Sequence, residues 1–275
     1  MEDKFVDKVY DSVNSKTKLL DKNFFDYLLR SMFAGLFLCL IYTFCMQIVS
    51  DFNGTPLPAL GKILMSYLFG IGLVFIVYFG AELFTSNAMY FSLGYSHKRV
   101  GIKKTLKLLI SCWIGNFFGA IIMAAILVGT GLFNPSDGIF PDAALYELAA
   151  KKASLPWDQV LFRGILANFI VNVVIYIQSV VKDDVAKLLI IPLGLMPFVY
   201  LGFEHSIANF GVFLMTWFTP DAATQAVYHG HHFTTLGAFH NLLFATLGNI
   251  IGGGLMVGGY FAYLNRQKIK KQHKE

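Results

Sequence analysis

The sequence predicts an all-α membrane protein with six transmembrane helices in two inverted three-helix repeats, the second and fifth helices being broken. Three observations lead to this fold class. Of 275 residues, 56% are hydrophobic and only 14% are charged, whereas an ordinary soluble domain carries about 25% charged residues. The charges are clustered and leave membrane-sized gaps, and short motifs of the first half recur in the second. The composition excludes a disordered chain, and three cysteines do not form a disulfide scaffold.

The charge-free gaps define the spans, because a transmembrane helix needs about 20 apolar residues. We expect spans near 27–50, 62–95, 105–130, 158–181, 185–218 and 238–264. The second and fifth are too long for one crossing and have polar residues near their middle. The chain then divides into an amphipathic N-terminal segment (1–26) at the cytoplasmic interface, a pore domain (27–264) and a basic tail (265–275).

The distribution of Lys and Arg predicts the orientation. Eighteen lie on the side of the two termini, and four lie opposite: Lys62, Lys151, Lys152 and Arg163. The positive-inside rule therefore places both termini in the cytoplasm, in a multi-pass protein of the cytoplasmic membrane. The same bias explains the net charge of +5 without a nucleic-acid partner. We expect the basic tail to contact anionic membrane lipid.

An internal repeat supports the inverted architecture. Residues 78–82 (YFGAE) are echoed by 200–204 (YLGFE), and residues 115–119 (GNFFG) by 248–252 (GNIIG). Three spans in each half is an odd number, so the second copy is inverted in the membrane. Inverted repeats with broken helices at matching positions are typical of transporters. The glycines four residues apart are interpreted as helix-packing positions.

Three ionisable residues lie at mid-span depth: Glu82, Glu204 and His205. Such groups cost about 2.5–3.5 kcal/mol on insertion scales, which makes them candidates for function. Gly80 and Gly202 precede the carboxylates and let the backbone leave the helix. We interpret both carboxylates as braces that accept free N–H groups at the breaks, in preference to proton carriers. His205 titrates near pH 6.5 when unperturbed and is interpreted as a pore residue.

The broken helices favour a small anion as ligand, because half-helices direct N–H groups and a positive dipole end toward the break. The sequence contains no cofactor motif, so no cofactor is expected. His229, His231 and His232 are interpreted as a surface run and not as a metal site, which needs three or four converging ligands. Their role stays open.

Several motifs resemble those of the formate/nitrite transporter family over nearly the whole chain. Residues 202–209 (GFEHSIAN) resemble its signature, and residues 82–86 (ELFTS) resemble the loop of its broken second helix. Residues 164–168 (GILAN), 240–243 (HNLL) and 247–249 (LGN) are similar to motifs of its fourth and sixth helices. The chain departs from the family pattern at Ala167, where several members have cysteine. The tracts 82–89 and 240–249 favour the nitrite-type branch.

The resemblance implies an aquaporin-like homopentamer with a pore in each subunit. It implies transport of formate, nitrite, hydrosulfide, lactate or acetate. It further implies that Thr85 and His205 flank the central site and that Lys152 near the external vestibule has Asn168 as its partner. One constriction would be formed by Leu83 and Phe198, and the other by Phe69 and Leu73.

We therefore expect a transporter of a small monovalent anion, formate or nitrite, which crosses the apolar constrictions as the neutral acid. Hydrosulfide and short monocarboxylates are alternative substrates. A neutral-solute pore is a weaker alternative, because Asn134-Pro135 is the only Asn-Pro pair and paired Asn-Pro-Ala loops are lacking. A membrane-embedded enzyme is a further alternative, but the sequence shows no set of catalytic groups that converge at one depth. A sensor protein with a closed pore is not excluded by the sequence. The choice between channel and proton-coupled carrier, and gating by residues 1–26, are also left undecided.

Overall fold

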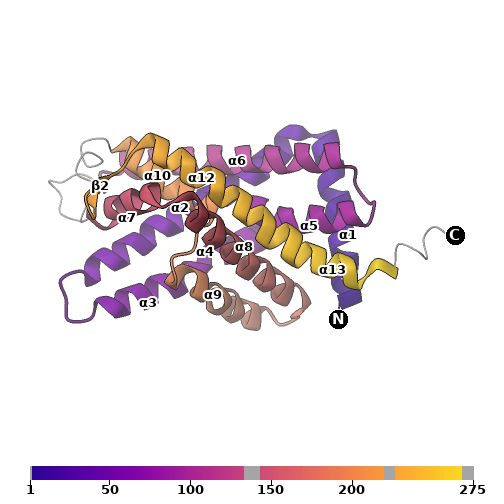
Figure 1. Cartoon of the computed structure of the whole chain (residues 1–275). Helices are drawn as coiled ribbons and strands as arrows, with labels where there is room; N and C mark the ends of the chain where they lie inside the picture. The colour runs from indigo at the N-terminus through magenta and orange to yellow at the C-terminus, as the bar shows by residue number, and fades with distance from the viewer. Residues whose placement is uncertain (1, 133–142, 220–226, 268–275) are drawn as a thin grey trace.

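The computed structural model describes residues 2–132, 143–219 and 227–267. They form a bundle of helices with one short β-hairpin (Figure 1). The first half contains α1 (Glu2–Lys22), α2 (Phe24–Phe52), α3 (Pro58–Leu68), α4 (Gly70–Phe79), α5 (Phe84–Ser96) and α6 (Ile102–Gly129). The second half contains α7 (Ala143–Ser154), α8 (Trp157–Val180), α9 (Asp184–Tyr200), α10 (Ser206–Phe218), β1 (Val227–Tyr228), β2 (His231–His232), α12 (Thr235–Asn249), the π-helix η1 (Ile250–Gly258) and α13 (Gly259–Leu264).

The expected membrane-spanning helices are present. Five stretches of the described chain are long and apolar enough to cross a membrane: Phe24–Phe52, Pro58–Phe79, Ile102–Gly129, Trp157–Val180 and Thr235–Leu264. The pair α9 and α10 completes the predicted set, since each is too short to qualify alone. The fold is that of an all-α membrane protein.

The predicted breaks in the second and fifth spans are confirmed. Gly80 ends α4 with φ +71°, and Gly202 follows α9 with φ +69°. This left-handed region is open to glycine at little cost, which explains why a glycine stands at both positions. The chain restarts as a helix after Leu83 and after His205, which have matching extended backbones (φ −102° and −113°).

The two halves pack in matching ways. A Cβ at Gly119 would lie 1.8 Å from the Met32 carbonyl oxygen, and a Cβ at Gly252 would lie 2.0 Å from the Ile165 carbonyl oxygen. Only glycine permits these approaches, of α6 to α2 and of η1 to α8. The predicted packing role of the repeated glycine motif is confirmed.

Helix α1 packs against protein along its apolar side. The Phe5 ring lies 4.9 Å from the Tyr176 ring of α8 and 4.8 Å from the Phe261 ring of α13, and Val9 and Val13 are also buried. An amphipathic α1 helix was expected from the sequence. Its apolar face, which we expected to lie on the membrane interface, is instead covered by other helices of the bundle. Helices α1 and α13 share one end of the bundle, which we call the Lys16 side (Figure 1).

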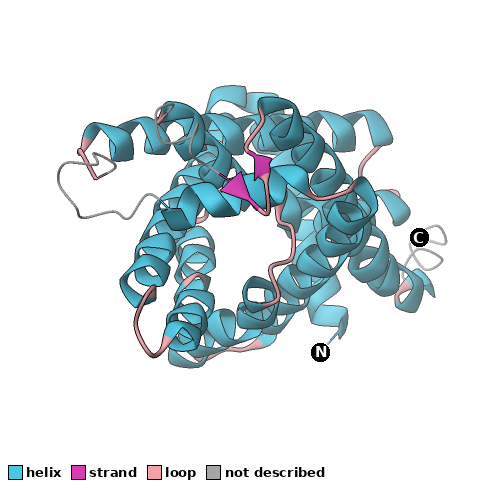
Figure 2. Cartoon of the chain, turned by 60° about the vertical axis from the view of Figure 1, so that its left-hand side comes forward, coloured by secondary structure: helices cyan, strands magenta, loops and turns pink. Residues whose placement is uncertain are grey.

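The opposite end, which we call the Lys152 side, carries α7 and the hairpin. Figure 2 brings this end forward and shows the two short strands against the surrounding helices. His229, His231 and His232 are exposed on the hairpin, which agrees with their interpretation as surface residues. Helix α7 was not expected from the sequence, and it positions Lys152.

Candidate functional site

The carboxylate of Glu204 lies at the second helix break inside a dense set of donors. Its two oxygens each lie 3.0 Å from the Lys152 ammonium nitrogen. The Asn209 and Asn241 amides donate to Oε2 at 2.6 and 3.2 Å. The side chains of Lys152 and Glu204 are 5% and 1% exposed, so this ion pair is buried.

Glu82 at the first break has an equivalent arrangement. Its Oε2 lies 2.6 Å from the Lys16 ammonium of α1 and accepts a hydrogen bond from the Asn87 amide at 3.0 Å. Lys16 also donates to the Asn87 carbonyl oxygen at 2.7 Å. The side chains of Lys16 and Glu82 are 15% and 7% exposed, so this pair is nearer to water than its counterpart.

Two asparagines cap the broken helices. Asn116 accepts from the backbone N–H two residues after Glu82 (3.0 Å) and donates to the Glu82 carbonyl (2.8 Å). Asn249 does the same after Glu204, at 2.9 Å in both bonds. At each break one backbone N–H and one carbonyl therefore pair with an asparagine, and the carboxylates take side-chain donors. This corrects the expectation that the glutamates accept the free N–H groups.

His205 and Thr85 meet between the two breaks, as expected. The His205 Nε2 lies 3.0 Å from the Thr85 hydroxyl, and the Ala208 N–H donates to Nδ1 at 3.2 Å. Because Nδ1 is an acceptor, the neutral ring carries its proton on Nε2, which donates to the Thr85 oxygen. The Thr85 O–H is then left to donate to another group. A second proton on Nδ1 would face the Ala208 N–H.

Two buried amides of α8 hold Thr85 in place. Asn168 donates to the Thr85 carbonyl at 3.0 Å and to the Asn249 carbonyl at 2.6 Å, while Asn172 donates to the same Thr85 carbonyl at 3.2 Å. Asn168 thus belongs to the Thr85 network, whereas the resemblance implied that it partners Lys152. Asn172 was not among the site residues predicted from the sequence. Its spacing of four residues from Asn168 on an apolar helix is the signal that could have found it.

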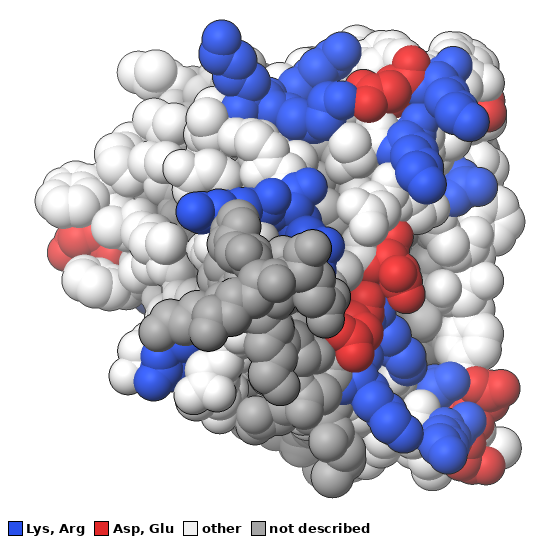
Figure 3. All heavy atoms as spheres, turned by 90° about the vertical axis from the view of Figure 1, so that its right-hand side faces the viewer, with Lys and Arg blue, Asp and Glu red and all other residues white. Residues whose placement is uncertain are grey.

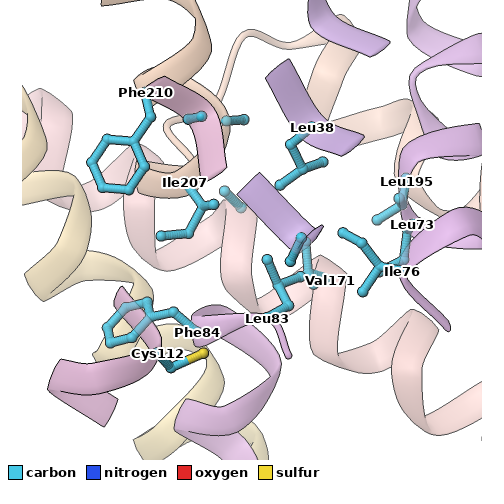
Figure 4. Close-up of a cluster of buried hydrophobic side chains, with 14 of the residues drawn as sticks. Leu38, Leu73, Ile76, Leu83, Phe84, Cys112, Val171, Leu195, Ile207 and Phe210 are labelled. Carbon is cyan, nitrogen blue, oxygen red and sulfur yellow. The ribbon is translucent and has the colours of Figure 1, made fainter. Parts of the chain in front are cut away.

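Apolar side chains bound this polar centre. The Phe69 and Phe198 rings pack edge to face with their centres 5.7 Å apart, and the centre of the Phe198 ring lies 6.1 Å from that of the His205 ring. The family resemblance implied that the two phenylalanines belong to different constrictions, but they lie together. Leu73 and Leu83 are 3% exposed and belong to the apolar cluster of Figure 4.

A cavity of about 400 Å³ lies on the Lys152 side and borders the two phenylalanines. Its lining includes Phe69, Phe198, His205, Lys152 and Glu204. The cavity thus borders both the Lys152–Glu204 ion pair and the Phe69–Phe198 contact, and it reaches His205.

Comparison with known proteins decides the family. The family model described as formate/nitrite transporter matches residues 3–263. The chain belongs to the formate/nitrite transporter family. It is 33% identical over 266 residues to the uncharacterized transporter YwcJ of Bacillus subtilis, covering 96% of this chain and 99% of the relative.

Two further relatives are named for the anions nitrite and formate. The nitrite transporter NirC of Salmonella typhimurium is 31% identical, covering 74% of this chain and 72% of the relative. The formate channel FocA of Haemophilus influenzae is 29% identical, covering 92% and 91%. This formate/nitrite transporter family member is therefore a membrane transport protein for small anions and not an enzyme.

Solved structures agree with this assignment. A chain described as an FNT family ion channel superposes with a TM-score of 0.79 at 26% identity, covering 95% of this chain and 98% of the other. The fold is also that of a pentameric formate channel with formate bound, with a TM-score of 0.72 at 23% identity and coverage of 88% and 97%.

Proposed function

We propose that this formate/nitrite transporter family member carries formate or nitrite across the membrane and that the substrate passes the constrictions as the neutral acid. The observation that carries the proposal is the His205–Thr85 pair, a fixed set of hydrogen-bond groups next to the Phe69–Phe198 contact. The names of NirC and FocA support the two substrates.

The aromatic constriction is the physical reason for a neutral permeant. Two phenyl rings in contact offer no replacement for the water of a bare anion, whose transfer to an apolar medium costs tens of kcal/mol in the ideal limit. A neutral acid avoids most of this cost. The low dielectric near the constriction raises the proton affinity of the approaching anion, as it does for a buried carboxylate.

The proton comes from water in the cavity and not from His205. The Ala208 N–H occupies the nitrogen that an incoming proton would need, so the ring serves as a fixed donor to Thr85. The Thr85 hydroxyl, which is left free to donate, then holds the substrate oxygen as it passes. Lys152 uses two of its three N–H groups on Glu204 and offers the third to the anion at the floor of the cavity.

We assign the Lys16 side to the cytoplasm, with both termini there. Lys and Arg side chains are spread over this face among fewer carboxylates (Figure 3), in agreement with the 18 to 4 distribution of Lys and Arg in the sequence. The cavity then opens to the outside of the cytoplasmic membrane, and the basic tail meets anionic lipid. We assign a homopentamer, since the chain shares the fold of a pentameric formate channel.

Transport into proteoliposomes tests the proposal. Uptake of formate, nitrite, hydrosulfide and lactate is compared at two pH values, and formate or nitrite is expected to enter faster at the lower pH. Thr85→Val removes the hydroxyl at nearly constant volume and is expected to slow uptake, whereas Thr85→Ser, its matched control, retains it.

His205→Asn keeps a polar group without a titratable ring. We expect it to alter the maximal rate and to leave the pH dependence in place, because the proton travels with the substrate. Water flux without anion flux would refute the proposal and favour a neutral-solute pore. Preferred uptake of hydrosulfide or lactate would replace formate and nitrite as substrates.

A further inference from the structure

The cavity on the Lys152 side gathers every Lys and Arg that the sequence places opposite the termini. Lys62 comes from α3, Lys151 and Lys152 from α7, and Arg163 from α8. All four line the same cavity of about 400 Å³. Membrane insertion favours cations on the other side, so their convergence here is not explained by topology.

Lys152 is the least able of the four to attract an anion from a distance. Its ammonium lies 3.0 Å from both oxygens of Glu204, and the pair carries no net charge. Seen from several ångströms away, such a pair is a dipole whose field falls off faster than that of a single charge. Recruitment of an anion therefore needs a cation that has no carboxylate partner.

The two other lysines are held by aromatic rings. The Lys62 ammonium lies 4.3 Å from the centre of the Tyr200 ring, and the Lys151 ammonium lies 5.3 Å from the centre of the Tyr228 ring. A ring face orients a cation without cancelling its charge. Across residues 2–132, 143–219 and 227–267, neither lysine forms an ion pair.

Arg163 completes the set with a neutral partner. Its Nη2 donates to the Gln159 side-chain oxygen at 3.3 Å. Besides Glu204, the described lining of the cavity contains one carboxylate, Glu147. Among the described lining residues, these three cations therefore outnumber Glu147 and give the outer part of the cavity an excess of positive charge.

We propose that Lys62, Lys151 and Arg163 form an outer collecting site for small monovalent anions, which fills before the substrate reaches Lys152. This inference rests on the proposed anion transport and assigns recruitment to residues other than the buried lysine. The site holds the substrate as the anion in a wet cavity, and protonation follows at the narrower floor. It acts on capture and not on passage through the constriction.

The triple variant Lys62→Gln/Lys151→Gln/Arg163→Gln tests the site in the full-length protein. Initial formate uptake by proteoliposomes is measured against formate concentration at low and high ionic strength. Protease access to a C-terminal tag reports which side of the protein faces the added anion. One unit charge about 10 Å away in water changes anion occupancy roughly twofold, so three charges give about a five- to tenfold higher half-saturation concentration.

The expected signature is specific to collection. The half-saturation concentration rises at low ionic strength, the maximal rate stays within about twofold, and the difference from the parent protein shrinks once salt screens the charges. If the triple variant does not assemble, the single variants carry the test, each with about a twofold shift.

A matched control removes three exposed lysines from the Lys16 side: Lys98→Gln/Lys103→Gln/Lys107→Gln. It changes the net charge equally and is expected to leave half-saturation from the Lys152 side unchanged. An equal shift in the control would overturn the inference, as would unchanged half-saturation and salt dependence in the triple variant. A parent protein that moves no anion would instead end the proposed function itself.

Discussion

The buried Lys152–Glu204 pair gives a quantitative prediction for stability. Glu204→Gln keeps the shape of the side chain but leaves the Lys152 ammonium without a counter-charge, and Lys152→Met leaves the carboxylate without one. Both side chains are at most 5% exposed, so solvent screens the loss of the partner charge only weakly. Removing one partner of such a pair costs about 3–5 kcal/mol.

The double variant Lys152→Met/Glu204→Gln removes both charges together. Asn209 and Asn241 then still donate to the amide oxygen of the new glutamine. Replacing a whole buried ion pair by uncharged groups often changes stability little. We therefore expect the free energy of unfolding of the double variant to lie within about 2 kcal/mol of that of the parent. It is thus expected to be more stable than either single variant.

The measurement is unfolding of purified protein in detergent, analysed as a double-mutant cycle. The cycle Lys16→Met/Glu82→Gln serves as comparison. Lys16 is 15% exposed and reaches water more easily, so its coupling energy is expected to be smaller. A double variant whose loss equals the sum of the two single losses would refute the reasoning, because the two charges would then not depend on each other.

Three further predictions concern the breaks and the constriction. Asn249→Ala leaves a buried N–H and a buried carbonyl without partners and is expected to cost about 1–3 kcal/mol for each; a protein that unfolds like the parent would contradict the capping role. Gly202→Ala meets no atom within 4 Å at its Cβ, so its expected loss of about 1–2 kcal/mol in an unfolding measurement comes from the left-handed backbone alone, and no loss would argue against that conformation. Phe198→Ala removes one ring of the constriction and is expected to raise lactate uptake relative to formate uptake in proteoliposomes; an unchanged ratio would show that this ring does not select.

The sequence predicts the breaks well because they are encoded locally. A glycine two residues before a carboxylate, inside an apolar stretch of membrane length, leaves few other structures available. The recurrence of this pattern in both halves also predicts the inverted repeat. The meeting of Thr85 and His205 follows from the symmetry of the two breaks together with the family resemblance.

The partners of the two carboxylates are not predictable in this way. Lys16 and Glu82 are separated by 66 positions in the sequence, and Lys152 and Glu204 by 52. Their pairing depends on how α1 and α7 lie on the bundle. No local pattern of the sequence specifies these positions.

The structural differences between the two halves are also not predictable from the sequence. The π-helix η1 follows Asn249, whereas α6 continues as a regular helix after the equivalent Asn116. A Cβ at Gly253 would lie 2.3 Å from the Asn168 amide nitrogen. The close approach of η1 to α8 thus depends on a glycine whose contact is set by the tertiary structure.

The proton stoichiometry of transport tests the central claim most directly. Proteoliposomes containing the parent protein receive labelled formate while internal pH and membrane potential are recorded together. Passage as the neutral acid predicts that one proton enters with each formate and that no membrane potential develops. Formate entry that generates an inside-negative potential without internal acidification would contradict the account.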